Sequence, residues 1–144
     1  MKRYQIGYTQ GVFDMFHIGH LNLLKHAKEQ CEYLIVGVNS DDLVKEYKNK
    51  ETVVDEKERA EIVGSIKYVD KCVITDTLDK IDQWKKYQFE AIFIGDDWKG
   101  NDRWLKTEIE LEKVGAKVVY LSYTSGVSST YLRGREKNAV EEGH

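Results

Sequence analysis

The stretch "RYQIGYTQGVFDMFHIGH", residues 3–20, joins a short apolar segment to a glycine-containing turn and then to the start of a helical pattern. Residues 3–8 have the short, mostly apolar pattern that is typical of a β-strand. His17 and His20 follow at the point where helical spacing begins. A strand that leads through a tight loop into a helix is the opening unit of a βα fold. This stretch therefore predicts both the fold class and the place to look for a site.

The same alternation continues to residue 121. Short apolar β-type segments occupy residues 3–8, 33–38, 71–74, 91–95 and 117–121, as strands covered on both faces should. Between them lie charged stretches with helical spacing, marked by Leu21, Leu24, Ala27 and Lys28; Ala60, Val63 and Gly64; Ile81 and Trp84; and Leu105, Ile109 and Val114. We predict an α/β, Rossmann-like domain with a five-stranded parallel sheet in the order 3-2-1-4-5, flanked by helices.

Composition limits the class of protein. A chain of 144 residues is the length of one domain, which we expect over residues 1–134, followed by a disordered polar tail at 135–144. Charged residues make up 33% and the net charge is −3, which argues against a membrane span and against a nucleic-acid partner. No apolar signal segment opens the chain, so we expect a cytoplasmic protein. Cys31 and Cys72 lack the spacing of a zinc site or a disulfide framework.

The two histidines follow the first predicted strand, where ligands of open parallel sheets bind. Gly11 permits close approach of the backbone, and the helix that begins near His17 offers unpaired N–H groups and a positive dipole end. Because His17 and His20 are three apart, both side chains lie on one face of the first turn. Phosphate binding and an ordinary structural role stand equally open on these residues, and zinc is a weaker alternative because no third ligand is evident.

The motifs resemble those of a known family. "HIGH" (17–20), preceded by "GVFD" (11–14), resembles the HxGH signature of the nucleotidyltransferase superfamily. "YVDK" (68–71), "GDDWKG" (95–100) and "YTSGVSST" (123–130) extend the resemblance to the small bacterial glycerol-phosphate cytidylyltransferases, over residues 4–134. Class I aminoacyl-tRNA synthetases also carry HIGH, but they are much longer and have a KMSKS loop that is absent here.

The resemblance implies an activity and its partners. A cytidylyltransferase of this type moves CMP from CTP to a small polyol phosphate, here glycerol phosphate in the first instance, and releases pyrophosphate. Such chemistry needs charge neutralisation and alignment rather than a nucleophilic side chain, because the attacking phosphate oxygen is already anionic. The resemblance implies Mg²⁺ as cofactor and a homodimer, with neither nucleic acid nor membrane as partner.

It also implies catalytic residues: His17, His20, Lys50 and Arg59. The histidines stabilise the α-phosphate in the family, and lysines of a polar loop, here "KEYKNKET" (45–52), reach the phosphates. A solvated run of charges is the alternative for the lysines. A surface ion pair with Asp55 at i,i+4 is the alternative for Arg59.

The nucleotide-binding positions implied by the family pattern are Thr9, Gly11, Val12, Phe13, Lys48, Gly95, Asp97, Trp98, Tyr123, Gly126, Ser128, Ser129, Thr130 and Arg133. Asp97 is the candidate acceptor for the cytosine amino group, although an acid there often caps the next helix. Asp14 is a weak candidate for the metal, since Mg²⁺ relies mainly on substrate phosphates. The 126–130 serines and threonine suit β- and γ-phosphates, or an N-cap alone.

The chain departs from the family pattern at Tyr123-Thr124-Ser125, where Arg-Thr-Glu is common. Arg133 supplies a compensating charge, as in the ISSxxxR pattern of related adenylyltransferases, so adenylyl transfer is the alternative reaction. A nucleotide-binding protein without turnover is a second alternative. A nucleic-acid module that stacks bases on Trp84, Trp98 and Trp104 is a third, which the acidic balance disfavours. The identity of the acceptor stays open.

Overall fold

A computed structural model describes residues 2–122 and contains the predicted alternation of strands and helices. In chain order the elements are β1 (Tyr4–Gly11), α1 (Ile18–Gln30), β2 (Cys31–Asn39), α2 (Asp41–Lys48), α3 (Glu56–Gly64), β3 (Lys71–Thr75), α4 (Lys80–Tyr87), β4 (Ala91–Gly95), the 3₁₀ turn η1 (Asp96–Trp98), α5 (Asp102–Glu112) and β5 (Lys117–Leu121). All five predicted strands are present. β1 and β2 are longer than their apolar runs, which had marked only their centres.

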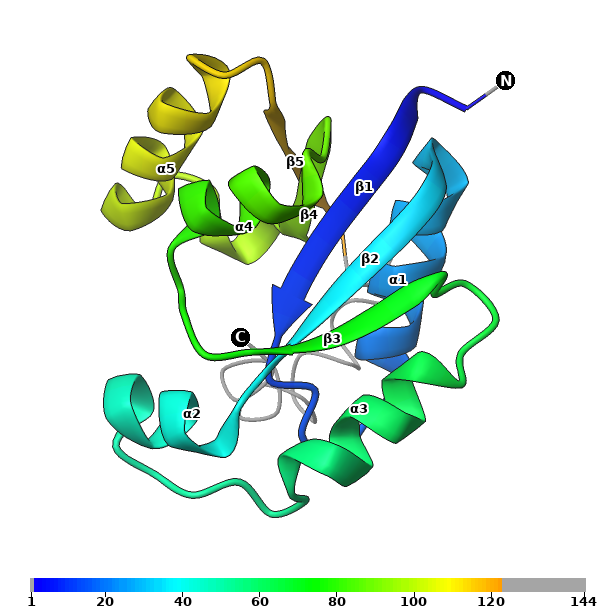
Figure 1. Ribbon diagram of the computed structural model, residues 1–144, viewed down its shortest axis with the longest axis vertical. Coiled ribbons are helices and arrows are strands. Elements are labelled where there is room, and N and C mark those ends of the chain that lie inside the picture. Colours follow the sequence, from blue (N-terminus) through cyan, green and yellow to red (C-terminus); the bar gives the residue numbers. More distant parts are fainter. Residues whose placement is uncertain (1, 123–144) are drawn as a thin grey trace.

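The sheet is parallel throughout and has the order β3-β2-β1-β4-β5, which confirms the prediction (Figure 1). β1 pairs with β2 over most of its length, from Tyr4↔Cys31 to Gly11↔Val38, and with β4 through Gly7↔Ala91 and Tyr8↔Ile92. The winding direction reverses between β1 and β4, so the loops after these two strands leave the same edge of the sheet side by side. That edge is where an open α/β sheet binds ligands.

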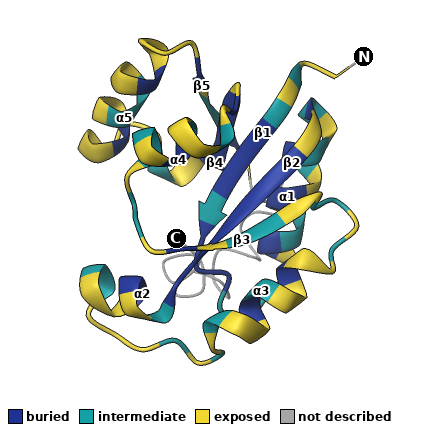
Figure 2. Cartoon of the chain, viewed as in Figure 1, coloured by how far each residue is buried: buried dark blue, intermediate teal, exposed yellow. Residues whose placement is uncertain are grey.

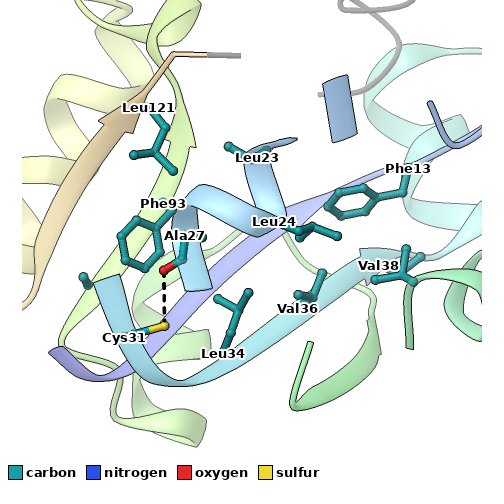
Figure 3. Close-up of a cluster of buried hydrophobic side chains, with 12 residues drawn as sticks. Phe13, Leu23, Leu24, Ala27, Cys31, Leu34, Val36, Val38, Phe93 and Leu121 are labelled. Atoms are coloured by element: carbon teal, nitrogen blue, oxygen red, sulfur yellow. Dashed lines mark hydrogen bonds between the residues drawn. The ribbon is translucent and has the colours of Figure 1, made fainter. Parts of the chain in front are cut away.

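Two apolar layers cover the two faces of the sheet. On one face α1 packs against β1, β2 and β4 and α3 packs against β2 and β3, and Figure 3 shows Leu23 and Leu24 of α1 near Val36 of β2. On the other face α4 and α5 cover Tyr8, Ile35 and Ile92, with Trp104 and Leu111 as the buried residues of α5. The central strands are almost entirely buried while α4 and α5 expose their outer surfaces (Figure 2).

α2 was not predicted. Residues 45–52 read as a polar loop, but Asp41–Lys48 form a helix that lies beyond the end of β2 (Figure 1). Ser40 caps this helix through a hydrogen bond from the Leu43 N–H, and Leu43 and Val44 are its buried residues. Acids in the first turn and lysines in the last turn also suit the helix dipole. The capping signal "SDD" was present in the sequence and should have predicted the helix.

Other expectations need smaller corrections. Val114 was assigned to the fourth predicted helix, but α5 ends at Glu112 and Gly115 turns the chain toward β5 with φ 87°. Cys31 and Cys72 are free thiols, as predicted, and the Cys31 Sγ–H donates to the Ala27 carbonyl (Figure 3). Within residues 2–122 no helix is long and apolar enough to span a membrane.

Candidate active site

A chain of hydrogen bonds ties the carboxyl ends of the central strands together. The Tyr8 hydroxyl donates to Gln10 Oε1, and Gln10 Nε2 donates to Asn39 Oδ1, both at 2.8 Å. Asn39 Nδ2 in turn donates to the Tyr47 hydroxyl of α2 at 3.0 Å. These polar groups fix the ends of β1 and β2 and the position of α2, so the rim of the switch point is a rigid platform.

The loop between β1 and α1 is held in a strained backbone conformation. Phe13 and Met15 both have positive φ, 56° and 48°, although neither is glycine. Such conformations cost roughly 1–3 kcal/mol each and persist only where the surrounding structure enforces them, most often at functional sites. The Phe13 side chain supplies part of that enforcement, because it is buried in the core against α1.

Three positions predicted to bind nucleotide have core side chains instead. Thr9 is buried and its hydroxyl donates to the Phe93 carbonyl, which links β1 to β4. Val12 and Phe13 are also buried. Any contact that these residues make with a nucleotide is therefore a contact of the backbone, and Gly11 at the end of β1 lies in the same buried run.

His17 and His20 form the start of α1 together. His17 is the N-cap, and its Nδ1 accepts from the Gly19 N–H at 3.0 Å. His20 Nδ1 accepts from the His17 N–H at 3.2 Å, so the pair makes a reciprocal capping box of the kind usually built from Ser or Thr with Glu. The rings stack with their centroids 3.9 Å apart, which confirms that both share one face of the first turn.

These bonds decide which ring nitrogen carries the proton. A nitrogen that accepts a hydrogen bond is unprotonated, so each neutral imidazole carries its proton on Nε2. Both rings of His17 and His20 thus present Nε2–H as a donor, beside the positive end of the α1 dipole. The arrangement favours an anion, which is one of the two interpretations that the sequence left open.

The two rings differ in burial. His17 is half-buried, whereas His20 exposes 2% of its surface and packs against Phe13 and Phe16 with ring centroids 5.3 Å away from each. The sequence analysis placed both imidazoles on one face of the first turn and did not distinguish them by burial. The aromatic packing instead orients His20 behind the more accessible His17.

Asp14 has a different environment from that expected of a metal ligand. Its two carboxylate oxygens accept from the backbone N–H groups of Val53 and Val54, at 2.7 and 2.9 Å. Among residues 2–122 no group of three or more His, Cys, Asp or Glu side chains is placed to hold a metal ion. Asp14 therefore joins the histidine loop to the segment between α2 and α3, and the geometry does not support its assignment to the metal.

Arg59 also differs from both expectations. Its side chain is 0% exposed and donates to the Val12, Asn39 and Val54 carbonyls, at 2.7 to 2.8 Å. It pairs with Asp41, not with Asp55, which caps α3 instead. The surface-charge alternative is therefore wrong. Contact with substrate phosphate stays a prediction, and the described contacts make Arg59 a positioning residue for the loop after β1.

Asp41 is the counterpart of Arg59 and was missed by the sequence interpretation. It also accepts from the Thr52 hydroxyl at 2.8 Å and from the Glu56 N–H at 3.2 Å. Burial opposes its charge, but the hydrogen bonds from Thr52 and Arg59 outweigh that effect and hold the pKa of Asp41 below its usual value. Its place directly after an N-cap serine was the only signal in the sequence.

The two predicted lysines lie at the end of α2 and just beyond it. Lys48 is the last residue of the helix, with its ammonium 5.9 Å from the centre of the Tyr47 ring, and Lys50 is exposed. Asn49 ends the helix in a left-handed conformation, φ 55°. The lysines therefore sit on the segment whose far end, at Val53 and Val54, is held by Asp14.

The loop after β4 carries the remaining described candidates. Gly95 ends β4 and is buried, and Asp97 and Trp98 lie in η1. Desolvation raises the pKa of Asp97, and the charge of Asp96 adds to the rise, although the side chain keeps contact with solvent. Asn101, not Asp97, caps α5, which removes the capping alternative for Asp97.

Six predicted nucleotide-binding positions lie outside the described residues: Tyr123, Gly126, Ser128, Ser129, Thr130 and Arg133. Within the described part, Asp14 and Arg59 both bind the segment that follows the lysines, through hydrogen bonds that meet at Val54, and the histidine pair follows Asp14 in the chain. The loop after β4 joins them at the same edge of the sheet.

Comparison with known proteins agrees with this geometry. The model of the family described as cytidylyltransferase-like matches residues 8–135. The glycerol-3-phosphate cytidylyltransferase of Bacillus spizizenii is 35% identical over 126 residues, which cover 87% of this chain and 92% of that protein. The Staphylococcus aureus protein of the same name is 32% identical and covers 87% and 89%.

One further relative and one solved structure also resemble this chain. The FAD synthase of Thermococcus kodakarensis is 36% identical over 115 residues, which cover 78% of this chain and 76% of that protein. A crystal structure of a lipopolysaccharide core biosynthesis protein from Thermoplasma volcanium superimposes with a TM-score of 0.71 at 26% identity. The superposition covers 83% of this chain and 97% of the Thermoplasma volcanium chain.

Proposed function

The chain belongs to the cytidylyltransferase-like family of nucleotidyltransferases, and from that premise we propose that it transfers CMP from CTP to a small phosphomonoester. Glycerol phosphate is the first-choice acceptor, because two curated relatives named for that activity match nearly the whole chain. The observation that carries the proposal is the stacked pair of His17 and His20, whose Nε2–H donors stand at the amino end of α1.

In the proposed reaction an oxygen of the acceptor phosphate forms a bond to the α-phosphorus of CTP. The bond from that phosphorus to the bridging oxygen of the β-phosphate breaks, and pyrophosphate leaves with the electron pair. Negative charge grows on the α-phosphate oxygens, where the Nε2–H groups of His17 and His20 donate hydrogen bonds. Fixed donors of this kind contribute about 10²–10³ each to the rate.

The rest of the described site positions these groups. Asp14 and Arg59 hold the strained loop before His17 through bonds to Val53, Val54 and the Val12 carbonyl. The same contacts hold one end of the segment that carries Lys48 and Lys50, and in the proposed complex the charges of these lysines offset the charge of the two reactants. No described side chain is needed as a nucleophile, because the acceptor phosphate is already anionic.

Mg²⁺ is the proposed cofactor. A magnesium ion that is bound chiefly by the oxygens of a triphosphate keeps several waters and needs no cage of protein carboxylates. This mode fits a site in which Asp14 is engaged by two backbone N–H groups. The ion would supply charge neutralisation to the triphosphate, and we assign no protein ligand to it.

Adenylyl transfer is the second candidate. The relative named FAD synthase makes a product that contains adenine, and it is 36% identical to this chain. Tyr123 also stands where the cytidylyltransferase pattern has arginine. We keep CTP first because the relatives named for cytidylyl transfer match a larger share of both chains.

The test is pyrophosphate release from each of the four nucleoside triphosphates with Mg²⁺ and a panel of small phosphomonoesters. The panel includes glycerol 3-phosphate, glycerol 2-phosphate and ethanolamine phosphate, and mass spectrometry identifies the products. We expect CTP to give the highest turnover and a CDP-linked product. A clear preference for ATP would replace cytidylyl with adenylyl transfer. Nucleotide binding without any turnover would remove the enzyme assignment.

A further inference from the structure

A small pocket opens between the amino ends of α4 and α5, at the carboxyl edge of the sheet. Its lining comes from the ends of β1, β2 and β4 and from the two helices: Gln10, Asn39, Leu78, Lys80, Ile94, Trp98, Arg103 and Trp104. Lys80 is the first residue of α4 and Arg103 the second of α5, two helices that lie side by side (Figure 1). Two positive dipole ends and two cations therefore meet at one place.

The two cations contact a backbone carbonyl and two indole rings. Lys80 Nζ donates to the Leu78 carbonyl at 2.8 Å and lies 5.4 Å from the centre of the Trp104 ring. Arg103 lies over the Trp98 ring at 5.5 Å. Within residues 2–122 neither makes an ion pair with a carboxylate, and the neighbouring Asp79 uses its Oδ1 to cap α4.

Partial burial of Lys80 beside Arg103, which is itself exposed, makes the positive charge of the lysine costly. Desolvation of the ammonium lowers the pKa of Lys80 to about 7, and the charge of Arg103 lowers it further, against a smaller opposing effect of Asp79. A bound anion would relieve both the desolvation and the repulsion. Like charges placed together without a counter-charge are a common feature of sites that receive an anionic ligand.

A second, independent observation points the same way. Trp104 is 6% exposed, and its indole N–H has no hydrogen-bond acceptor among the described residues. A buried N–H without a partner costs about 1–3 kcal/mol, so an acceptor is expected to complete it. The pocket has a volume of about 20 Å³, which is room for one water-sized group. That size admits a terminal oxygen of a ligand but not a sugar or a base.

We propose that this pocket, the Lys80–Arg103 pocket, binds a second anionic group of the acceptor, distant from the phosphate that reacts. The group is an oxyanion, a carboxylate or a further phosphate. The inference rests on the proposed transfer of CMP to a small phosphomonoester and replaces the first-choice acceptor: the acceptor carries a negative charge at its far end, whereas glycerol phosphate carries only hydroxyls there. Neither His17 nor His20 lines the pocket, whereas Trp98, a predicted nucleotide-binding position, does.

The test is a binding titration of the full chain that is followed by tryptophan fluorescence. Matched probes differ only at the far end: glycerol 3-phosphate has a hydroxyl and 3-phosphoglycerate a carboxylate, and glycerol 1,3-bisphosphate has a second phosphate. We expect at least one of the two probes with an anionic far end to bind at least tenfold more tightly than glycerol 3-phosphate. The stronger of them identifies the class of oxyanion.

Variants connect the preference to the pocket. Lys80→Met should abolish the tenfold preference while the Kd of glycerol 3-phosphate and of CTP changes by less than threefold. Arg103→Met, at the exposed mouth, should reduce the preference and serves if Lys80→Met does not fold. Lys85→Met, an exposed position on the same helix, should leave all three probes unchanged.

Each contrary result has a meaning. Equal affinity for all three probes, or an equal loss for all of them in Lys80→Met, would overturn the pocket as a site for a second anion. So would a loss confined to CTP. Because binding is measured without turnover, a preference that depends on Lys80 with no pyrophosphate release keeps the pocket and removes the proposed reaction. Pyrophosphate release with glycerol 3-phosphate, together with equal affinity for the three probes, would keep the proposed reaction and remove the pocket as an anion site.

Discussion

Arg59 and Asp41 form an ion pair at 2.5 Å that joins α3 to the start of α2, and the arginine is completely buried. The same guanidinium also donates hydrogen bonds to the carbonyl of Asn39, the last residue of β2, and to the carbonyl of Val12, directly after β1. The loop that precedes the histidines and the segment that carries the lysines are thus fixed to one side chain.

Arg59→Met should lower the free energy of unfolding by about 2–4 kcal/mol, because buried carbonyl groups lose their donors. Arg59→Lys should recover only part of this loss, since a point charge cannot reproduce the planar fork. Urea denaturation measures both variants. Lys57→Met, on the exposed side of α3, is the control and should stay within about 0.5 kcal/mol of the parent. A similar small effect of Arg59→Met would contradict the positioning role.

Asp41 should make the stability depend on pH in the acid range. Its pKa is lowered in the folded protein, so its carboxylate stabilises the fold above the unfolded value of about 3.9 and ceases to do so as pH falls through the folded value. Asp41→Asn should therefore be destabilising at pH 6, and the difference from the parent should shrink toward pH 3. Thermal unfolding at the two pH values measures this, with the exposed Asp42→Asn as control. A difference that does not change with pH would contradict the assignment.

Asp14 should control the opening of the segment between α2 and α3. Asp14→Ala removes the acceptor for the Val53 and Val54 N–H groups, so hydrogen exchange at these two amides should accelerate at least tenfold. Asp76→Ala, an exposed acid after β3, should leave both amides unchanged. Under the proposed function the same Asp14 variant should also lower turnover, because the lysine segment is no longer held. Unaltered exchange at both amides would show that other contacts fix the segment.

The sheet could be predicted from the sequence because its strands are apolar on both faces. Five such runs with helical spacing between them allow few parallel topologies, and the order β3-β2-β1-β4-β5 was predicted correctly. α2 was not predicted because only Leu43 and Val44 are buried in it, and two apolar positions are too few to show a helical period. The cap at Ser40 was the better signal.

The site was only partly predictable. The histidine spacing alone places both rings on one turn, and the structure confirms the pair. Three of the partners of Arg59, namely Asp41, Asn39 and Val12, lie 18 to 47 residues away in the chain, so no local pattern distinguishes a buried arginine from an exposed one. Lys80 and Arg103 likewise meet only because α4 and α5 start at the same edge of the sheet. Contacts of this kind depend on tertiary packing and cannot be predicted from the hydrophobic period of the sequence.

The proposed catalysis depends on His17 and His20, and steady-state pyrophosphate release from CTP in the His17→Ala variant measures this dependence. Removing one Nε2–H donor should lower kcat by about 10²–10³, while the Kd of CTP changes by less than threefold and the protein remains folded by circular dichroism. If His17→Ala keeps the turnover of the parent protein, His17 does not stabilise the transferring phosphate and the proposed mechanism is wrong.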